Sequence, residues 1–275
     1  MRYQPLLNTR FFFSTTPMPC PYLPNRMERR VVTELIGRDP VTLHEQLSFA
    51  GFRRSHGIAY APACTDCDAC KAVRVITREF KPTRSQRRVW NRNCHLGVEI
   101  CNPVATHEQY RVFSAYQRDR HGDGDMAKMD ILDYQGLIED TPVETVQVEF
   151  RDGDEKLVAV CLTDRMANAL SAVYSFFDPE HEGASLGSHM ILWLIKEAKR
   201  AGLEYVYLGF WVSNCTKMAY KARFQPMEVR TAEGWEMLKP DAIHDGVAGD
   251  LTARSTIPME VPNNLPFDDL LKPRA

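Results

Sequence analysis

The second half of the chain has the apolar periodicity of alternating strands and helices. Four segments have the pattern of strands, at residues 143–150, 156–162, 169–174 and 205–210. The turn sequence Asp152-Gly153-Asp154 separates the first two, so a β-hairpin is expected there. Residues 186–201 carry apolar side chains at a spacing of four, which predicts a long amphipathic helix between the third and fourth strands. This order predicts an α/β (α+β) fold with a mixed sheet.

The first hundred residues show shorter patterns and predict a loop-rich region. A short helix is expected over residues 41–51 and a strand over residues 73–76. Thr83 and Gln86 have the spacing of a capping box, which predicts a helix from Arg84 to about Asn93. We therefore expect a cysteine-containing N-terminal domain at 1–103, an α/β domain at 104–238 and a loosely ordered, proline-rich tail at 239–275.

Composition is that of an ordinary globular protein, with 44% hydrophobic and 25% charged residues. No run of about 18 apolar residues occurs, so no membrane partner is expected. The N-terminus lacks an uninterrupted apolar stretch before a cleavage site, and no signal peptide is predicted. The expected location is the cytoplasm.

Net charge is only −2, but its distribution is uneven. Residues 71–95 contain eight lysines and arginines and one acid, Glu79. The predicted helix places basic side chains on and beside one face, namely Arg84, Arg87, Arg88 and Arg92. Such a field favours contact with a nucleic-acid backbone, and the alternative is a solvated basic face.

Three cysteines lie within seven residues, Cys64, Cys67 and Cys70. In a reducing compartment this spacing indicates thiolate ligands for zinc or an iron–sulfur cluster, whereas the alternative is a loop of free thiols. A fourth ligand must come from elsewhere. Cys20 is our first choice, and Cys94 is the second.

The second half offers further candidates. Ser185 and Gly187 stand at the predicted start of the long helix, where free backbone N–H groups bind anions. Hairpin, strand, glycine turn, helix and strand resemble the layout of the GNAT acyltransferase superfamily. Asp178, shortly after the third strand, is an acidic candidate, with a turn cap as the alternative. Lys217 and Lys221 share the last predicted helix, and the alternative for both is a surface helix.

These segments together resemble the arginyl-tRNA–protein transferase family, and most closely its bacterial branch, the aspartate/glutamate leucyltransferases. The similarity covers roughly residues 10–235. The segments that carry it include C-P-Y-L-P-N-R-M-E-R at 20–29, G-F-R-R-S at 51–55, the cysteine segment at 60–75, R-S-Q-R-R-V-W at 84–90, Y-S-F-F-D-P at 174–179 and K-M-A-Y-K-A-R-F-Q-P at 217–226.

The resemblance implies transfer of an amino acid from charged tRNA to the N-terminus of proteins that begin with Asp or Glu, which marks them for degradation. Eukaryotic relatives bind an iron–sulfur cluster through cysteines, one of which falls where this chain has Leu23. An aminoacyl ester is already activated, so catalysis requires no cofactor and consists mainly of proximity and oxyanion stabilisation.

Site roles follow as expectations from the resemblance and the residue chemistry. Tyr174 and Asp178 are the candidates for the reacting centre. Arg53 or Arg54 is expected to receive the acceptor carboxylate, because arginine is the better carboxylate fork, and Lys217 is the other option. The basic helix, with Lys217 and Lys221, is expected to contact tRNA, and the thiol loop is expected to brace that helix.

Several alternatives stay open at this level. Leucine is favoured over arginine as the transferred residue, and the choice rests on the closer similarity to the bacterial branch. An acetyl-CoA-dependent GNAT acetyltransferase is a second possibility, although its fuller glycine pattern is missing. A third is a metal-stabilised RNA-binding protein whose acyltransferase-like domain is inactive.

Overall fold

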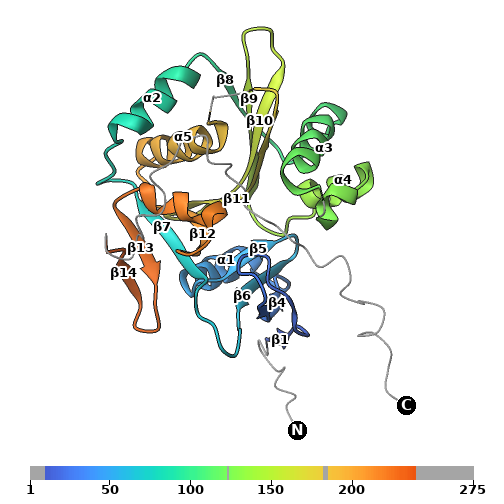
Figure 1. Cartoon of the computed structure of the whole chain (residues 1–275), viewed down its shortest axis with the longest axis vertical. Helices are drawn as coiled ribbons and strands as arrows, with labels where there is room; N and C mark the ends of the chain where they lie inside the picture. The colour runs from blue at the N-terminus through green and yellow to red at the C-terminus, as the bar shows by residue number, and fades with distance from the viewer. Residues whose placement is uncertain (1–9, 123, 182–184, 240–275) are drawn as a thin grey trace.

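The computed structural model describes residues 10–122, 124–181 and 185–239 of the chain. All of the tail expected at 239–275 except Lys239 lies outside these residues. A large sheet with helices on both faces occupies the upper part of Figure 1, and a small N-terminal sheet lies below it. None of the helices in these ranges is long and apolar enough to cross a membrane.

The large sheet has eight strands in the order β14-β13-β7-β12-β11-β10-β9-β8. Its strands are β7 (Lys71–Ile76), β8 (Gly97–Cys101), β9 (Thr145–Arg151), β10 (Leu157–Met166), β11 (Ala169–Phe177), β12 (Tyr205–Trp211), β13 (Met227–Arg230) and β14 (Trp235–Met237). The pairing of β11 with β12 is parallel and the other pairings are antiparallel. The predicted mixed sheet is therefore confirmed.

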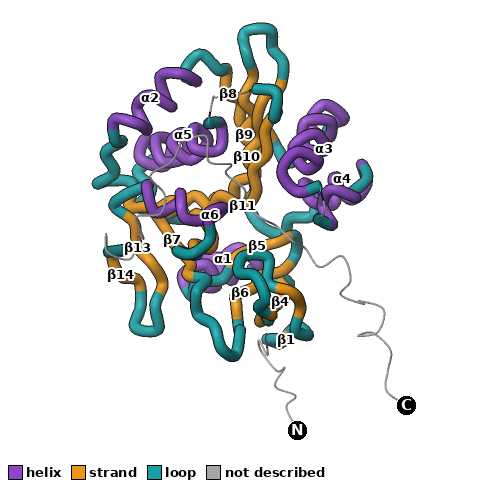
Figure 2. The backbone as a smooth tube through the Cα atoms, in the orientation of Figure 1, coloured by secondary structure: helices purple, strands orange, loops and turns teal. Residues whose placement is uncertain are grey.

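The β11–β12 crossover runs through α5 (Leu186–Arg200), as the apolar spacing predicts. This helix packs with α2 (Arg84–Asn93) on one face of the sheet, while α3 (His107–His121) and α4 (Ile131–Glu139) cover the other face (Figure 2). The short 3₁₀ helix η1 (Asp125–Lys128) lies between α3 and α4, and α6 (Thr216–Ala219) continues into a second one, η2 (Tyr220–Arg223). The main core lies between these helices and the sheet.

The N-terminal part is less loop-rich than the sequence suggests. It contains an antiparallel sheet in the order β1-β4-β6-β5. Its strands are β1 (Phe13–Ser14), β4 (Arg30–Glu34), β6 (Ile58–Pro62) and β5 (Arg53–Ser55), and β2 (Met18–Pro19) pairs separately with β3 (Met27–Glu28). Helix α1 (Pro40–Phe49) buries Leu43 and Leu47 against this sheet. Short strands of this kind carry too few alternations to be recognised from a pattern.

The large sheet spans the domain boundary expected at residue 103. Strands β7 and β8 come from before this residue, and β9 pairs with β8 from after it. Helix α2, which also precedes residue 103, packs on α5. The basic helix therefore packs on α5, which itself packs on β11 and β12 of the large sheet.

Candidate active site

The centre of the large sheet contains a point where two neighbouring strands stop pairing. Strands β11 and β12 pair only over Ala169–Ser171 and Tyr205–Tyr207. Beyond these residues their main-chain groups need other hydrogen-bond partners. Arg53 of β5 supplies one, because its Nη2 donates to the carbonyl oxygen of Val173 at 3.2 Å. The N-terminal sheet thus places a side chain at the central strands of the large sheet.

Gly209 of β12 makes room for this arginine. A Cβ atom at residue 209 would lie 2.5 Å from Cζ of Arg53, closer than any side chain allows, and φ of Gly209 is +70°. The guanidinium also lies 5.5 Å from the centre of the Phe210 ring, in cation–π contact. The backbone of β12 therefore shapes the seat of Arg53.

The guanidinium of Arg53 is buried without a neutralising partner. The residue is 6% exposed, and its Nη1 has no hydrogen-bond partner among the described residues. No described carboxylate lies within ion-pair distance of it, although such pairs are formed by its neighbour Arg54 and by Arg30 and Arg74. A buried cation with an unused donor edge is suited to bind a carboxylate.

Lys221 does not lie on the surface, contrary to its expected role in tRNA contact. Its side chain is fully buried in η2, and Nζ donates to the carbonyl oxygen of Phe210 at 2.6 Å. Burial, together with the positive charge of Arg53, holds the pKa of Lys221 well below its usual range. The prediction of a phosphate contact is wrong, because the apolar core around η2 separates this amine from solvent.

Arg54 is also not available to a substrate carboxylate. Its Nε and Nη2 donate to the two carboxylate oxygens of Asp164, each at 2.7 Å. Asp164 is itself fully buried and further accepts from Thr145 at 2.8 Å. The guanidinium fork is already occupied, so of the two expected arginines only Arg53 keeps a free edge.

Tyr174 and Asp178 lie on β11 and just after it, with different partners. The Tyr174 hydroxyl is buried and accepts a short hydrogen bond from Nε2 of Gln117, and burial raises the pKa of Tyr174. Asp178 pairs with Lys156 at 2.7 Å and accepts from the backbone N–H of Glu180 at 3.0 Å. Asp178 therefore has the contacts of a turn cap, the alternative raised from the sequence.

The basic helix forms as predicted. Thr83 and Gln86 make both hydrogen bonds of the capping box. The buried residues of α2 are Gln86, Val89 and Asn93, whereas Arg84, Arg87, Arg88 and Arg92 are exposed. Lys217, in α6, is exposed as well. The structure thus presents four arginines on the outside of a helix that is packed on α5.

Ser185 and Gly187 stand at the start of α5, where the anion site was expected. Ser185 is the residue before the helix and has left-handed backbone angles, and Gly187 is buried in the first turn. The preceding residues 182–184 lie outside the described part of the chain. The helix begins where the sequence predicts.

The four candidate ligand cysteines line one small cavity of about 20 Å³. Its lining includes the aromatic residues Tyr22, Tyr60 and Phe210 and the ion pair of Glu28 with Arg30. Burial, followed by the neighbouring thiols, raises the pKa of Cys70 to about 12. Cys94 is exposed at the end of α2, so the structure brings together the first-choice set of four.

The thiol cavity adjoins Arg53. The thiol loop was expected to brace the basic helix, but the residues that line the cavity come from other segments. Tyr60 packs edge-to-face on Phe210 with ring centres 5.9 Å apart, and Phe210 lies beneath Arg53. Among the described residues, the trio of candidate ligand atoms within 4.8 Å of one another is Glu99, Cys101 and Glu149, not the cavity thiols. Four thiols are the donor type that zinc and iron–sulfur clusters take. A single zinc ion needs sulfurs about 4 Å apart, so these thiols would have to move toward one another to bind one.

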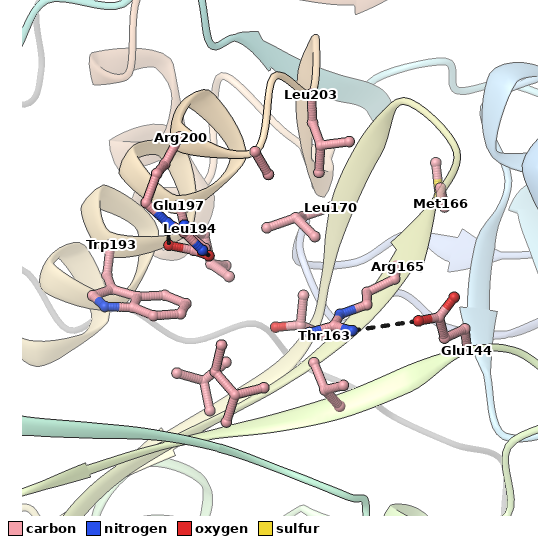
Figure 3. Close-up of a pocket in the computed structure, with 14 residues that line it drawn as sticks. Glu144, Thr163, Arg165, Met166, Leu170, Trp193, Leu194, Glu197, Arg200 and Leu203 are labelled. Carbon is pink, nitrogen blue, oxygen red and sulfur yellow. Dashed lines mark hydrogen bonds and ion pairs between the residues drawn. The ribbon is translucent and has the colours of Figure 1, made fainter.

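A second cavity, of about 340 Å³, lies between α5 and strands β9 and β10 (Figure 3). Its floor is largely apolar and includes Leu170 and Trp193. Its arginines are already paired, Arg165 with Glu144 at 3.4 Å and Arg200 with Glu197 at 2.5 Å. None of the site residues predicted from the sequence lines this cavity. The arginines at its rim are neutralised by the glutamates that pair with them.

Two residues that shape the Arg53 seat were missed in the sequence. An isolated glycine inside the strand pattern at 205–210 is a signal for close backbone approach, and Gly209 has that role. Asp164 is an acidic residue within an apolar strand. Such a position indicates that the carboxylate has a buried cationic partner, but the sequence does not identify that cation.

Comparison with known proteins gives a consistent result over most of the chain. Residues 18–88 match the family model described as arginine-tRNA-protein transferase, N terminus, and residues 108–231 match the model for its C terminus. An aspartate/glutamate leucyltransferase of Paramagnetospirillum magneticum is 51% identical over 240 residues, which are 87% of this chain and 98% of that protein. One of Gluconobacter oxydans is 52% identical over 238 residues, covering 86% and 98%.

Among solved structures, the C-terminal domain of a putative lysylphosphatidylglycerol synthetase from Agrobacterium fabrum superimposes with a TM-score of 0.46. The sequence identity is 14%, over 74% of this chain and 67% of that one.

Proposed function

The chain belongs to the arginine-tRNA–protein transferase family, and we propose that it transfers leucine from Leu-tRNA to the N-terminal Asp or Glu of proteins. The product would carry a new N-terminal leucine, which marks it for degradation. The proposed location of the reaction is the cytoplasm, where charged tRNA is available. The names of the relatives support leucine as the amino acid that is transferred.

The observation that carries the proposal is the unpaired donor edge of Arg53. A buried cation without a counter-charge costs several kcal/mol, and a bound carboxylate would offset that cost. An acceptor that begins with Asp or Glu supplies such a carboxylate, whereas Asn or Gln does not. Preference for an acidic first residue follows from this electrostatic difference.

The donor tRNA would lie along the exposed arginines of α2. Because α2 packs on α5, a phosphate backbone that follows these arginines is led toward the start of α5, where Ser185 and Gly187 lie. Backbone N–H groups at a helix start favour the negatively charged 3′ region. Lys217 of α6 is a further exposed cation.

The thiol cavity is proposed to hold an iron–sulfur cluster or zinc through Cys20, Cys64, Cys67 and Cys70. The group would stabilise the wall made by Tyr60 and Phe210, and the transfer chemistry itself requires no cofactor. Metal and acid-labile sulfide analysis of the purified protein and of Cys20→Ser tests this assignment. Equal, near-zero metal content in both would exclude it.

The activity test uses Leu-tRNA and Arg-tRNA with radiolabelled amino acids and peptides that begin with Asp, Glu, Asn or Lys. We expect label from Leu-tRNA on the Asp and Glu peptides. Label from Arg-tRNA alone would keep the family and change the donor, and acetylation from acetyl-CoA without any transfer from tRNA would replace the proposal. Binding of tRNA with no transfer would favour the inactive RNA-binding alternative.

Arg53→Met gives the residue-level test of the same proposal. It removes the buried charge while keeping an unbranched side chain of similar length. We expect transfer to Asp peptides to fall at least about 100-fold while the weak transfer to Asn peptides changes little, since a charge-assisted hydrogen bond is worth about 3 kcal/mol. An equal loss for both peptides would show that Arg53 does not read the carboxylate.

A further inference from the structure

Strand β1 is an edge strand of the N-terminal sheet, and its exposed side chains are apolar. The sheet order β1-β4-β6-β5 leaves β1 paired on one side only, with β4. Phe11, Phe12 and Phe13 are 66%, 51% and 49% exposed. Three aromatic rings at this exposure leave on the order of 300 Å² of apolar surface in contact with water. A contiguous apolar patch of this size indicates a contact surface.

The backbone of β1 has hydrogen-bonding groups that point away from β4. The N–H of Thr15 donates to the carbonyl oxygen of Arg30 at 2.9 Å, and the carbonyl oxygen of Phe11 accepts from Oγ1 of Thr33 at 2.9 Å. Because successive residues of a strand direct their N–H and C=O groups to opposite sides, residues 11, 13 and 15 face β4. The N–H and C=O groups of Phe12 therefore face outward, and Phe12 is exposed.

The sequence of this edge carries no charge and no proline that would keep another strand away. Residues 11–16 read F-F-F-S-T-T. Sheets commonly protect an exposed edge with lysine or proline residues, because unpaired N–H and C=O groups are a template for a further strand. The edge of β1 is therefore suited to pair with an additional strand.

We propose that β1 pairs with β1 of a second copy of this chain, antiparallel about a two-fold axis at Phe12. In this register Phe12 lies opposite the partner's Phe12, and Phe11 lies opposite the partner's Phe13. The outward backbone groups of Phe12 bond to their own equivalents across the axis, and those of Ser14 bond to the partner's Arg10. A run of three identical residues is its own complement under a two-fold rotation, which is what an isologous interface requires.

The side chains fit the same register. The rings of Phe11 and Phe13 are stacked with their centres 6.4 Å apart, and the ring of Phe12 packs on Phe52 at 6.1 Å. Pairing brings the partner's Phe13 beside Phe11 and the partner's Phe11 beside Phe13, so four rings gather on one face. Arg10 stands opposite a serine, so like charges do not meet across the axis.

Residues 1–9, which precede β1 in the chain, are the competing occupant of this edge. A hairpin with a two-residue turn at Asn8-Thr9 would place Pro5 opposite Phe12. Proline has no N–H to donate to the outward carbonyl oxygen of Phe12. A second copy supplies both the donor and the acceptor at this position, so it fits the edge better.

Pairing at β1 leaves the candidate active site open. Arg53 lies in β5, at the other end of the four-stranded sheet, and Figure 1 shows α2 and β1 at opposite ends of the molecule. The apolar patches of two copies bury on the order of 600 Å², well below the roughly 1,200 Å² at which stable interfaces begin. The dimer is therefore transient, and its population rises with protein concentration.

Sedimentation velocity of the whole chain, at concentrations from about 1 to about 200 µM, measures this association. We expect monomer at the low end and dimer at the high end. Species larger than a dimer are not expected, because two-fold pairing uses the edge of each copy once.

Phe12→Lys places two like charges opposite each other at the axis and removes the central rings. It should weaken dimerisation at least about 10-fold. Leu132→Lys is the matched control, because Leu132 is 70% exposed and lies in α4, outside the N-terminal sheet. The control should leave the dissociation constant unchanged.

Ser14→Pro is the second variant, because the N–H that it removes points away from β4. One hydrogen bond is lost in each half of the two-fold interface, so association should weaken about 10-fold. Ser14→Ala keeps the N–H and should associate as the unmodified chain does. In the unmodified chain, the amide hydrogens of Phe12 and Ser14 should exchange more slowly at the high concentration than at the low one.

A monomer at every concentration would overturn the proposal and leave the edge to residues 1–9 or to another protein. A dimer that both Phe12→Lys and Ser14→Pro leave unchanged would overturn it as well, because the copies would then associate through another surface. Equal weakening by Leu132→Lys would show non-specific association of apolar side chains and would likewise contradict it. None of these measurements uses leucine transfer, so the outcome is independent of the proposed function.

Discussion

Arg54 and Asp164 form a fully buried two-point ion pair that ties the N-terminal sheet to the large sheet. Nε and Nη2 of Arg54 lie 2.7 Å from the two carboxylate oxygens of Asp164. His44 of α1 also lies 3.4 Å from this carboxylate. Because Arg54 follows Arg53 in β5, the ion pair of Arg54 with Asp164 fixes the strand that carries Arg53, the residue expected to bind the substrate carboxylate.

Asp164→Asn should therefore destabilise the protein strongly. It leaves the Arg54 guanidinium buried without a counter-charge, which costs about 3–5 kcal/mol. Urea unfolding followed by fluorescence measures the change in the free energy of unfolding. Asp154→Asn, in an exposed hairpin turn, is the matched control and should stay within about 0.5 kcal/mol of the original value. If Asp164→Asn lowers the free energy of unfolding by less than about 1 kcal/mol, the buried ion pair does not stabilise the protein as expected.

Gly209→Ala should lower the rate of transfer to acidic acceptors while the protein remains folded. The added Cβ would collide with Arg53, so the guanidinium must leave its place between β11 and β12. Gly202→Ala is the control, because Gly202 also has a positive φ of +73° but has no atom within 4 Å of an added Cβ. Both variants should lose about 1 kcal/mol of stability from backbone strain, whereas only the change at residue 209 should lower the transfer rate, at least about 10-fold. Similar activity of the two variants would argue against the placement of Arg53 beside Gly209 as a requirement for transfer.

His189 predicts an acid-sensitive contact between α2 and α5. Its ring lies 5.2 Å from Trp90, and burial, with a smaller effect of His95, lowers its pKa to about 4. A folded-state pKa below the unfolded value near 6.5 means that the stabilisation is present above pH 6.5. It is lost as the pH falls from 6.5 toward 4, by on the order of 3 kcal/mol.

Unfolding of the wild type and of His189→Gln at pH 7 and pH 4.5 checks this expectation. The variant should be less stable at pH 7, because it loses ring packing. It should also lose less stability on acidification than the wild type does. Equal losses in the two proteins would mean that other groups cause the acid sensitivity.

The exposed arginines of α2 should contribute to tRNA affinity through phosphates and not through sequence. Arg88→Ala should weaken binding of charged and uncharged tRNA alike. It should also reduce the slope of log affinity against log salt by about one, as expected when one phosphate contact is lost. Filter binding between 50 and about 200 mM salt measures this slope. Arg111→Ala, at an exposed position of α3, is the control, and an equal change in both variants would argue against a specific basic face.

Periodicity identified the second half of the fold well and the first half poorly. The capping box of α2, the spacing of four in α5 and the hairpin turn at residues 152–154 are local signals, and each segment adopted the predicted structure. The strands of the N-terminal sheet span two to five residues, too few for a reliable alternation. The pairing of β7 with β12 joins residues far apart in the chain, and no local pattern records such a contact.

The sequence by itself determined the family, the order of the main strands and the long helix between residues 143 and 210, the arginine helix and the choice of four candidate cysteines. Only the tertiary structure separated Arg53 from Arg54 and placed Lys221 in the interior. The two arginines are adjacent in β5, and identical side chains at adjacent positions carry no local signal of their partners. Asp164 neutralises one of them and a gap in strand pairing receives the other, because the free energy of a buried charge is set by neighbours from distant segments.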